Sequence, residues 1–464
     1  MYDLIVIGAG PGGYVAAIRA AQLGKSVVVV EREAPGGVCL NWGCIPSKNL
    51  IHQAECFQAL RDMEAVGVSV DRTTLDYAAV QAKSREVVKT LTGGVAGLLK
   101  RNGVEFLTGT ATIVSPREVT LQNAQGSRRL TGENILVATG SRALEVPGFE
   151  FDEQIVLSST GILAMTRLPK SLVILGAGAI GCEFAYVMNS FGVRVTLVEA
   201  LEHILPTEDG ETCAVLDTSF KRSGIDVRVG TRAKDLVRGD QSVTVTLEDA
   251  DGGSEQITAD KALVVFGRVP NTGNLGLDAV GVKLDARGYV EVGDFGQTSV
   301  PGIYAIGDVT ATPALAHVAS AEGEIVAVHL AGKETTRRAL DPETVPSAVY
   351  CEPQLAGFGL REERALAENI PVEKSVFHYP GAGKSIAIGK AEGLVKLLCD
   401  PRTGELLGAH IVGHNATELL HELLLAKNAE LLPEDVGEMM HAHPTLSEAV
   451  MEAARGIYRQ PVHG

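Results

Sequence analysis

Two stretches of the chain share one order of apolar and polar positions. Each opens on an unbroken apolar run, DLIVIG at residues 3–8 and SLVILG at residues 171–176, which predicts a short buried strand. A glycine-rich turn, an apolar helix-like segment, a single glycine and a second apolar run come next in both stretches. The pattern therefore predicts strand, loop, helix and strand within a parallel sheet, formed twice in the chain.

The two stretches stay in register at an offset of 168 residues. The glycines of the turns and the closing acids correspond one to one: Gly8, Gly10, Gly13 and Glu31 in the first copy, and Gly176, Gly178, Gly181 and Glu199 in the second. Glycines at this spacing let backbone N–H groups approach a pyrophosphate at a helix N-terminus, and the acid can hold a ribose diol. One such turn is a weak signal, but two of them with matching acids predict two bound dinucleotides.

Composition and charge narrow the class of protein. The 464 residues are 45% apolar and include 52 glycines and 19 prolines, which suits a folded chain with many tight turns. A net charge of −16 without any run of basic residues argues against nucleic acid and anionic membranes as partners. The first residues enter a strand without a basic leader, and no apolar run is long enough to span a bilayer. We expect a cytoplasmic protein.

Cys39 and Cys44 stand close together in the segment GGVCLNWGCIPSKN. Three explanations compete: a metal site, a redox disulfide and two unrelated buried cysteines. A metal site lacks ligands, because Ser47 stands where a ferredoxin-like motif needs a cysteine and the remaining cysteines are scattered singly. In a reducing compartment, a disulfide that does form is more often catalytic than structural.

A redox disulfide needs a backbone that brings the two sulfurs together. On a regular helix, cysteines five residues apart point about 140° away from each other. Pro46 suits the first position of a helix, so we expect residues 39–45 to form an irregular loop in front of it. Cys44 would then lie at the positive end of the helix dipole, which stabilises a thiolate. The residues favour a redox disulfide.

Six motifs in order cover essentially the whole chain: GAGPGG, GGVCLNWGCIPSK, GAGAIGCE, GRVPN, YAIGDV and HAHPTLSE. Together they resemble the flavoprotein disulfide reductases, which are class I pyridine nucleotide-disulfide oxidoreductases, and among these the dihydrolipoamide dehydrogenases. The resemblance implies oxidation of protein-bound dihydrolipoamide through a redox disulfide and FAD, with reduction of NAD⁺ to NADH. It also implies a homodimer with shared active sites, served by lipoyl domains of a 2-oxo acid dehydrogenase complex or a glycine cleavage system.

The resemblance assigns roles around the thiols. Cys39 would exchange with substrate, and Cys44 would lie against the flavin and pass electrons to it. Lys48 would stand beside the flavin with Glu183, from the GAGAIGCE motif, as its carboxylate partner. Without the resemblance, Lys48 could equally be a solvated lysine on a helix.

The resemblance places FAD on the first repeat and the nicotinamide cofactor on the second. Glu31 would hold the adenosine ribose, Asp308 in YAIGDV would lie near the ribityl chain, and Gly140 ends a further apolar strand. For the second repeat, the residues themselves favour NAD over NADP, because Glu199 repels a 2′-phosphate and no arginine comes directly after it. Arg194 is the one nearby cation, and we expect it to precede the strand.

The segment HAHPTLSE at residues 441–448 has three interpretations. A metal pair of His441 and His443 lacks a third ligand. Thr445 and Glu448 fit a capping box at a helix start, a structural role that the residues alone favour as much as a functional one. By the resemblance, His443 is the base that deprotonates dihydrolipoamide and Glu448 is the acid that orients it.

The order of motifs predicts an α/β protein with two Rossmann-like domains. We expect an FAD-binding domain at residues 1–146, an NAD-binding domain at 147–272, a central domain at 273–342 that completes the FAD site, and an α+β interface domain at 343–464. Asn49 and Val318 depart from the commonest pattern of the resembled family, outside the catalytic positions. The alternatives are a glutathione-type NAD(P)H-dependent disulfide reductase, which HAHPTLSE opposes, and a non-enzymatic flavin redox sensor or scaffold.

Overall fold

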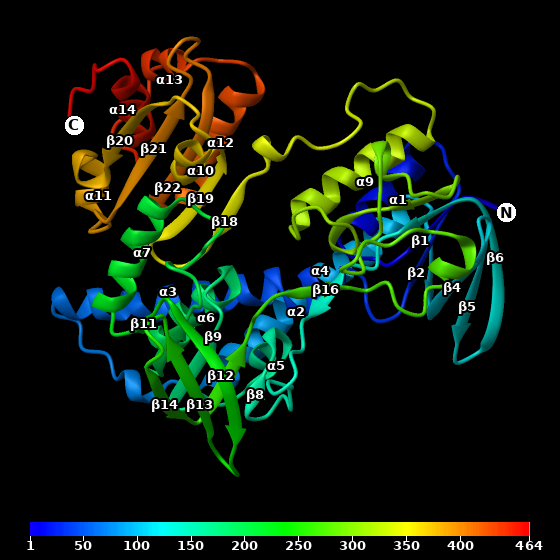
Figure 1. The fold of residues 1–464 in the computed structure, drawn as a ribbon, viewed down its shortest axis with the longest axis horizontal. Helices are drawn as coiled ribbons and strands as arrows, with labels where there is room; N and C mark the ends of the chain where they lie inside the picture. Colours follow the sequence, from blue (N-terminus) through cyan, green and yellow to red (C-terminus); the bar gives the residue numbers. More distant parts are fainter. Residues whose placement is uncertain (464) are drawn as a thin grey trace. The chain divides into compact units, whose positions relative to one another are not determined.

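The computed structural model describes residues 1–463, and the chain forms two compact units (Figure 1). Each unit is assembled from three separate segments. Unit 1 comprises Met1–Asn49, Ala78–Leu144 and Phe266–Leu340. Unit 2 comprises Leu50–Tyr77, Glu145–Val265 and the described residues from 341 onward. The first glycine turn lies in unit 1, and the second lies in unit 2.

The main sheet of unit 1 carries the first repeat. Its strand order is β3-β2-β1-β6-β5-β4, with β17 paired to β6. Its strands are β1 (Tyr2–Ile7), β2 (Val27–Glu31), β3 (Glu105–Thr108), β4 (Thr110–Ser115), β5 (Glu118–Asn123), β6 (Gly126–Val137) and β17 (Ile303–Ala305). β1, β2, β3, β6 and β17 pair in parallel, whereas β4, β5 and β6 form an antiparallel meander. The apolar runs of β1 and β2 are buried because helices cover this sheet.

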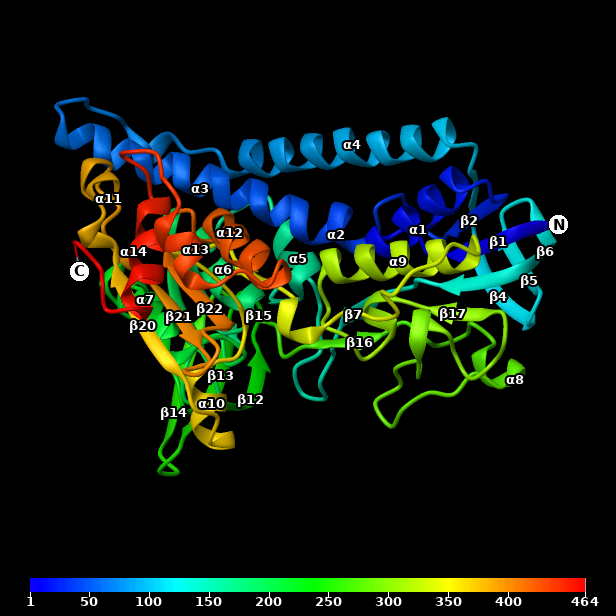
Figure 2. The same cartoon turned by 90° about the horizontal axis from the view of Figure 1, so that it is seen from above.

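Helices α1 (Pro11–Gln22) and α9 (Ala316–Leu330) lie side by side in unit 1 (Figure 2). Small residues let their backbones touch, since a Cβ atom on Gly323 would stand 2.6 Å from the carbonyl oxygen of Gly12. The remaining elements assigned to this unit in whole or in part are α2 (Gly37–Trp42), α3 (Cys44–Ala65), α4 (Tyr77–Arg101), β7 (Ser141–Ala143), β16 (Arg268–Pro270), α8 (Leu277–Val280), η2 (Asp294–Gly296) and η3 (Gly307–Val309).

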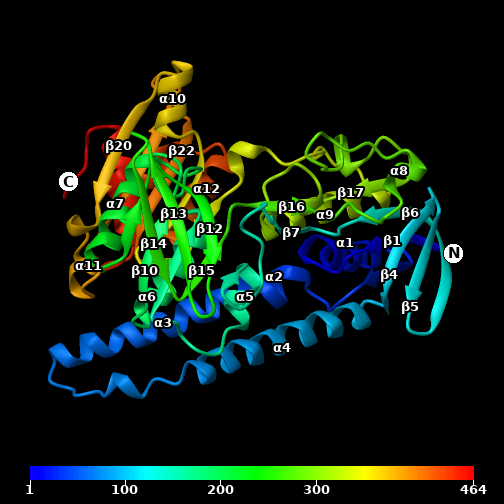
Figure 3. The ribbon, with the colours of Figure 1, turned by 60° about the horizontal axis from the view of Figure 1, so that its bottom comes forward.

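The second repeat forms a five-stranded parallel sheet in unit 2, in the order β11-β10-β9-β15-β8. Its strands are β8 (Val156–Leu157), β9 (Ser171–Leu175), β10 (Arg194–Val198), β11 (Asp226–Arg228) and β15 (Lys261–Val264), with helices α5 (Ser159–Ala164), α6 (Ala179–Ser190) and α7 (Gly210–Arg222). An antiparallel sheet of β12 (Thr231–Arg238), β13 (Val243–Asp249) and β14 (Ser254–Ala259) comes after β11 (Figure 3). Both repeats thus form the parallel sheets that the apolar pattern predicts.

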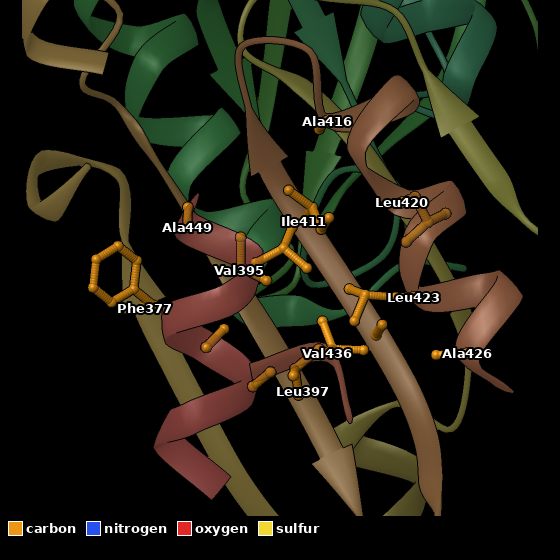
Figure 4. Packing of buried hydrophobic residues seen from close by; sticks show 14 of the residues in the cluster. Phe377, Val395, Leu397, Ile411, Ala416, Leu420, Leu423, Ala426, Val436 and Ala449 are labelled. Carbon is orange, nitrogen blue, oxygen red and sulfur yellow. The ribbon is translucent and has the colours of Figure 1, made fainter. Parts of the chain in front are cut away.

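The C-terminal part of unit 2 is an antiparallel sheet covered by helices, in the order β18-β19-β22-β21-β20. Its elements are β18 (Ser347–Val349), β19 (Gln354–Gly359), α10 (Glu362–Glu368), β20 (Glu373–His378), α11 (Gly383–Ala387), β21 (Gly393–Cys399), β22 (Leu406–Gly413), α12 (Ala416–Asn428), α13 (Pro433–Glu438) and α14 (Ser447–Ile457). The short 3₁₀ turns of unit 2 are η1 (Arg72–Thr74), η4 (Pro342–Thr344) and η5 (Tyr379–Gly381). Side chains of the sheet, such as Val395 and Ile411, pack against Leu420 and Leu423 of α12 (Figure 4). This core holds α14 and the segment before it in place.

A buried ion cluster joins the second repeat to the C-terminal sheet within unit 2. Lys396 lies in the apolar strand β21 with none of its side chain exposed. Its Nζ atom is 2.9 Å from Oδ2 of Asp209, which caps the N-terminus of α7. Glu211 and Glu362 also approach the Nζ atom, at 3.1 and 2.5 Å. A buried lysine is tolerated only where carboxylates compensate its charge, as they do here.

The expected short strands and helices of the interface segment are present as β18, β19 and α12. β17 in the predicted central segment joins the first sheet. The predicted domain boundaries at residues 146, 272 and 342 remain predictions. Within residues 1–463, no helix is both long and apolar enough to cross a membrane.

Candidate active site and dinucleotide sites

The first glycine turn leads directly into α1. Gly8 has a φ of 101°, a left-handed conformation that glycine adopts without strain, and it brings the turn against the end of β6. A Cβ atom on Gly13 would stand 2.0 Å from the carbonyl oxygen of Gly8, so the helix can approach the strand only with glycine there. Glu31 closes the arrangement, because its Oε2 atom accepts a hydrogen bond of 2.7 Å from the amide of Ala9.

The second turn repeats this geometry in unit 2. Gly176 has a φ of 105°, and a Cβ atom on Gly181 would again stand 2.0 Å from the carbonyl oxygen of the first glycine. The amide of Ala177 donates to Oε2 of Glu199 at 2.8 Å. The other carboxylate oxygen of Glu199 accepts from the amide of Leu201 at 3.0 Å.

Both turns fit the dinucleotides that the sequence predicts. Gly10 and Gly178 immediately precede helices α1 and α6, and nothing lies within 4 Å of a Cβ atom placed on either glycine. This open space at a helix N-terminus is where a pyrophosphate can approach backbone N–H groups. The glutamates at the ends of β2 and β10 stand where a ribose diol is held in such folds.

The cations around Glu199 do not form a phosphate site. Arg194 is the first residue of β10 rather than a residue before it, a small correction, and it stands at the other end of that strand from Glu199. Arg228 was not predicted and is closer, since its carbonyl oxygen accepts from the amide of Glu199. Its guanidinium donates to Asp226 at 2.8 Å and faces Glu255 at 3.8 Å, so these acids already balance its charge. The surroundings of Glu199 therefore fit NAD.

The two candidate redox thiols lie on consecutive helices, and the predicted irregular loop at residues 39–45 is wrong. Cys39 lies within helix α2, and Cys44 is the first residue of α3. Gly43 separates the helices with φ −149° and ψ −113°, a break that a single regular helix does not contain. Pro46 is the third residue of α3, where its missing N–H is still unneeded. The expected position of Cys44 at a helix N-terminus is found.

The two thiols are close enough to interact directly. A hydrogen bond with Cys44 raises the pKa of the Cys39 thiol, and burial raises it further. The charge of Lys48 opposes this shift, so Lys48 stands within electrostatic reach of the pair. When the pair is reduced, this shift favours the protonated thiol at Cys39.

Asp308 lies in a polar chain that joins three distant segments of unit 1. The Ser141 hydroxyl donates to Oδ2 of Asp308 at 2.5 Å. Ser141 begins β7 and comes directly after Gly140, which lies in the turn between β6 and β7 rather than at the end of a strand, as the sequence had suggested. Arg268 donates from Nε to the Ser141 hydroxyl at 2.6 Å and lies 3.7 Å from Asp308. Burial lowers the pKa of Arg268, while the charges of Asp308 and Cys44 raise it. Arg268 thus connects the predicted ribityl site to the thiol.

Sequence reasoning assigned no function to Ser141, Arg268 or Glu322. Glu322 on α9 accepts from the amide of Gly307 at 2.7 Å and holds the turn that carries Asp308. Burial raises the pKa of Glu322, and the hydrogen bond from Gly307 opposes the shift. The GRVPN motif was a signal for Arg268, but its partner Ser141 is 127 residues away in the chain.

Arg85 on α4 supports the helix of Cys39. Its guanidinium lies 4.2 Å from the centre of the Trp42 ring and donates to the carbonyl oxygen of Asn41 at 2.6 Å. That carbonyl is at the end of α2, where helical acceptors lack partners within the helix. Arg85 therefore closes the short helix just before the break at Gly43.

His443 and Glu448 form a pair in unit 2. Nδ1 of His443 lies 2.9 Å from Oε1 of Glu448, and Oε2 of Glu448 accepts from the amide of Thr445 at 2.9 Å. The amide hydrogen bond and the contact with His443 hold the pKa of Glu448 below its ordinary value. The predicted capping box is only half formed, because the Thr445 hydroxyl donates to Ala442 and α14 begins at Ser447. The carboxylate of Glu448 thus contacts both His443 and the amide of Thr445, with different oxygens.

Lys48 and Glu183, the predicted ion pair beside the flavin, lie in different compact units. Lys48 belongs to unit 1, whereas Glu183 belongs to unit 2 and accepts from the amide of Tyr350 at 3.2 Å. Their pairing stays a prediction, as does the meeting of the thiols with His443. Within the described part of the chain, no group of three or more His, Cys, Asp or Glu side chains could hold a metal ion.

Two family models cover most of the chain. The model described as pyridine nucleotide-disulphide oxidoreductase matches residues 2–323. The model described as its dimerisation domain matches residues 345–454, so a dimerisation domain comes after the two glycine turns.

Curated relatives match over almost the full length. A dihydrolipoyl dehydrogenase from Geobacillus stearothermophilus is 42% identical over 461 residues, which is 99% of this chain and 97% of the relative. One from Thermus scotoductus is 44% identical over 463 residues, or 100% of this chain and 98% of the relative.

Solved structures share the fold. LpdA from Mycobacterium tuberculosis matches with a TM-score of 0.91 and 28% identity, covering 98% of this chain and 99% of that one. The flavoprotein disulfide reductase RclA from Escherichia coli matches with a TM-score of 0.86 and 26% identity, at the same coverage of both chains. The predicted fold class is confirmed.

Proposed function

This chain belongs to the pyridine nucleotide-disulphide oxidoreductase family, and we propose how its own residues oxidise protein-bound dihydrolipoamide. The predicted dihydrolipoyl dehydrogenase activity, with FAD and NAD as cofactors, is confirmed by relatives at 42% and 44% identity. The roles of individual residues, the pairing of subunits and the lipoyl-domain partners are proposals. The observation that carries them is the direct interaction of Cys39 with Cys44 in the unit that holds the first dinucleotide turn.

The proposed cycle begins at the base. Nδ1 of His443 is held by Glu448, so Nε2 takes the proton from a dihydrolipoamide thiol. The substrate thiolate attacks Sγ of Cys39, the bond between Cys39 and Cys44 breaks, and Cys44 leaves as a thiolate. The second substrate thiol attacks the substrate sulfur bound to Cys39 as its proton passes to the Cys39 sulfur, which leaves as a thiol. It closes the lipoamide disulfide and leaves two electrons in the thiol pair.

FAD supplies the path by which that electron pair reaches NAD⁺. In the proposed arrangement the first turn with Glu31 would hold the adenosine half of FAD, Asp308 would lie near the ribityl chain, and Gly140 would be a further cofactor-binding residue. Lys48 and Glu183 form an ion pair beside the flavin. The second turn with Glu199 holds NAD⁺. The fit of both turns and the chain from Arg268 through Ser141 to Asp308 support this assignment.

We propose that the enzyme works as a homodimer with shared sites. The thiols and the base lie in different compact units, and a dimerisation domain spans residues 345–454, which includes His443. A two-fold axis would make both sites equivalent, each with thiols from one chain and the base from the other. The substrates are lipoyl domains of a 2-oxo acid dehydrogenase complex or a glycine cleavage system.

Reduction of NAD⁺ by free dihydrolipoamide tests the activity. Reduction of glutathione disulfide by NADPH is the contrasting assay, because it measures the activity of the alternative, a glutathione-type reductase. The Cys44→Ser variant should keep FAD, because the dinucleotide turn is elsewhere, and lose dihydrolipoamide turnover by about 10³-fold. It should also lose the long-wavelength absorbance of a thiolate against the flavin. Full turnover in this variant contradicts the disulfide mechanism.

Co-expression tests the shared site. Cys44→Ser and His443→Ala chains, each inactive alone, should form half hybrid dimers when they mix freely. Each hybrid has one intact and one doubly altered site, so activity should recover to about a quarter of wild type. Sites built within single chains would all carry a lesion, and purified hybrids would be no more active than the parents.

A further inference from the structure

A second imidazole–carboxylate pair lies two residues before the proposed base. Only 3% of the His441 side chain is exposed, whereas 76% of the His443 side chain is exposed. Nε2 of His441 lies 2.8 Å from Oε1 of Glu422 on α12. Its Nδ1 atom lies 3.0 Å from the carbonyl oxygen of Met439. The proposed catalytic cycle uses neither His441 nor Glu422.

Both ring nitrogens of His441 face oxygen atoms that accept hydrogen bonds. A carbonyl oxygen only accepts, and so does an ionised carboxylate. A neutral imidazole has a single N–H and would leave one of these two contacts without a proton. The ring that satisfies both contacts has a proton on each nitrogen and forms an ion pair with Glu422.

His443 has the opposite arrangement. Only its Nδ1 atom is held, by Glu448, and among residues 1–463 no hydrogen-bond partner occupies its Nε2 atom. His443 can therefore exchange a proton at Nε2, whereas His441 is held at both nitrogens.

Two charged residues on the helices that flank this segment have partners of their own. On α14, Arg455 bonds to Glu452 and to the carbonyl oxygen of Gly437. On α13, Asp435 accepts from the amide of Leu432. Glu448 on α14 faces both histidines.

His441 already acts on the acid of the proposed base. The amide of Thr445 contributes most to the lowered pKa of Glu448, and His443 contributes next. The charge of His441 contributes in the same direction. The electrostatic influence of His441 therefore reaches the pair of His443 and Glu448.

We propose that His441 is a positioning residue for the base. Its imidazolium, paired with Glu422, fastens the segment that carries His443 to α12 and balances the charge beside the His443–Glu448 pair. This inference rests on the proposed function, because it requires His443 as the base. An intact ion pair adds little net charge at His443, but removal of either member leaves the other uncompensated.

The test is the pH dependence of kcat/KM for dihydrolipoamide oxidation by the holoenzyme. His441→Gln leaves the negative charge of Glu422 uncompensated, and this charge favours the protonated form of His443. The acidic limb of the kcat/KM profile should therefore move to higher pH by about half a unit. Glu422→Gln keeps an accepting oxygen opposite His441 and removes only the anion, so the limb should move to lower pH by a similar amount. The double variant should return towards wild type.

His421→Gln is the matched control, because His421 lies on the same helix and, within residues 1–463, has a hydrogen bond only with the carbonyl oxygen of Glu418, at 3.3 Å. It should leave the profile unchanged. Opposite shifts in the two single variants support the ion pair. Shifts in the same direction, or no shift in either, overturn the proposal.

Two further measurements separate the possible failures. Reduction of ferricyanide by NADH needs neither thiols nor base, so a variant that keeps this rate is folded and carries its cofactor. A fully active His443→Gln variant refutes the proposed function. If His443→Gln is inactive but His441→Gln and Glu422→Gln do not shift the pH profile in opposite directions, only this inference is refuted. Should a variant misfold, neutron diffraction of the wild-type protein decides: deuterium on both ring nitrogens of His441 supports the proposal, and deuterium on one overturns it.

Discussion

The two glycine turns are almost the same structure, but their surroundings hold them by different forces. The amide after the first glycine donates to the closing glutamate at 2.7 Å in one turn and 2.8 Å in the other. Behind the first turn, α1 packs on α9 through close backbone contacts that need glycine at positions 12 and 323. The sheet of the second turn is instead joined to the C-terminal sheet by the buried charges of Lys396 and Asp209.

The segments attached to the two closing glutamates also differ. After Glu31 the chain builds α2 and α3, which present Cys39 and Cys44. After Glu199 it passes to α7, whose first turn is capped by Asp209 and which carries no redox pair. The dinucleotide-binding turn is thus a local structure, whereas the chemistry of each site depends on the segment that comes after its closing glutamate.

The largest expected effect comes from adding one methyl group to either turn. Gly13→Ala should yield protein without flavin absorbance, because its Cβ atom meets the carbonyl oxygen of Gly8 at 2.0 Å. Gly181→Ala should keep the flavin and weaken NAD⁺ binding by about 100-fold, which corresponds to about 3 kcal/mol of overpacking. Absorbance spectra and NAD⁺ titrations measure both. Gly97→Ala, on an open face of α4, is the control. Loss of flavin from the Gly181→Ala protein would contradict the assignment.

The next prediction concerns the contacts that attach each turn to the rest of its unit, and the stability that each unit loses without them. Lys396→Met leaves the buried carboxylate of Asp209 without its cation and should destabilise unit 2 by about 3–5 kcal/mol. Gly323→Ala forces α1 and α9 apart and should destabilise unit 1 by about 1–3 kcal/mol. Hydrogen exchange by mass spectrometry assigns each loss to its unit. Equal loss of protection in both units would show that the two attachments are not independent.

The two attachments should also differ in their response to acid. Burial opposes ionisation of Asp209, but the charges of His410 and Lys396 hold its pKa below the ordinary value. A carboxyl group with a lowered folded pKa stabilises the fold above its unfolded pKa, about 3.9, and loses that contribution as pH falls further. Protection of unit 2 should therefore decrease below about pH 4, and Lys396→Met should show a smaller decrease.

A smaller effect is expected at the closing glutamates. Glu199→Ala should reduce the preference for NAD⁺ over NADP⁺ by about tenfold or more, because a charged acceptor of a ribose diol is lost. Glu31→Ala should loosen FAD and leave the nicotinamide preference as it is. The ratio of kcat/KM for the two nucleotides measures this. A wild-type enzyme that works better with NADP⁺ would refute the assignment of the second turn.

The smallest effect tests a support that only the first repeat has. Arg85→Lys keeps the charge but loses the planar stack on Trp42, at a cost of about 1 kcal/mol or less. Trp42 is the only tryptophan of the chain, so its fluorescence emission should shift to longer wavelength. Arg101→Lys, at the end of the same helix, is the control. Unchanged emission would show that Arg85 does not hold α2.

Much of this structure could be predicted from local signals. Glycines at fixed spacing need only their neighbours to form a turn, and apolar runs identify buried strands, so both repeats were found from the sequence. The helix break at Gly43 was missed because Pro46 suggested a later helix start. A proline is acceptable anywhere in the first turn, so it does not define the first residue.

Interactions between distant segments could not be predicted in the same way. Lys396 in GLVKLLC resembles a lysine that reaches solvent from a strand, and only the fold shows the three acids around it. The contact between Arg268 and Ser141 also depends on two segments far apart in sequence. His441 fits a metal motif by spacing, yet its partner Glu422 lies on helix α12, 19 residues earlier in the chain.

The segmented composition of unit 1 has a consequence for protein synthesis. Its main sheet contains β17, at residues 303–305, which pairs with β6, at residues 126–137. A ribosome adds about 5–20 residues per second. β17 therefore leaves the ribosomal exit tunnel only after more than half of the chain has been made, and later than the other strands of this sheet. FAD can therefore bind to a complete sheet only late in the synthesis of the chain.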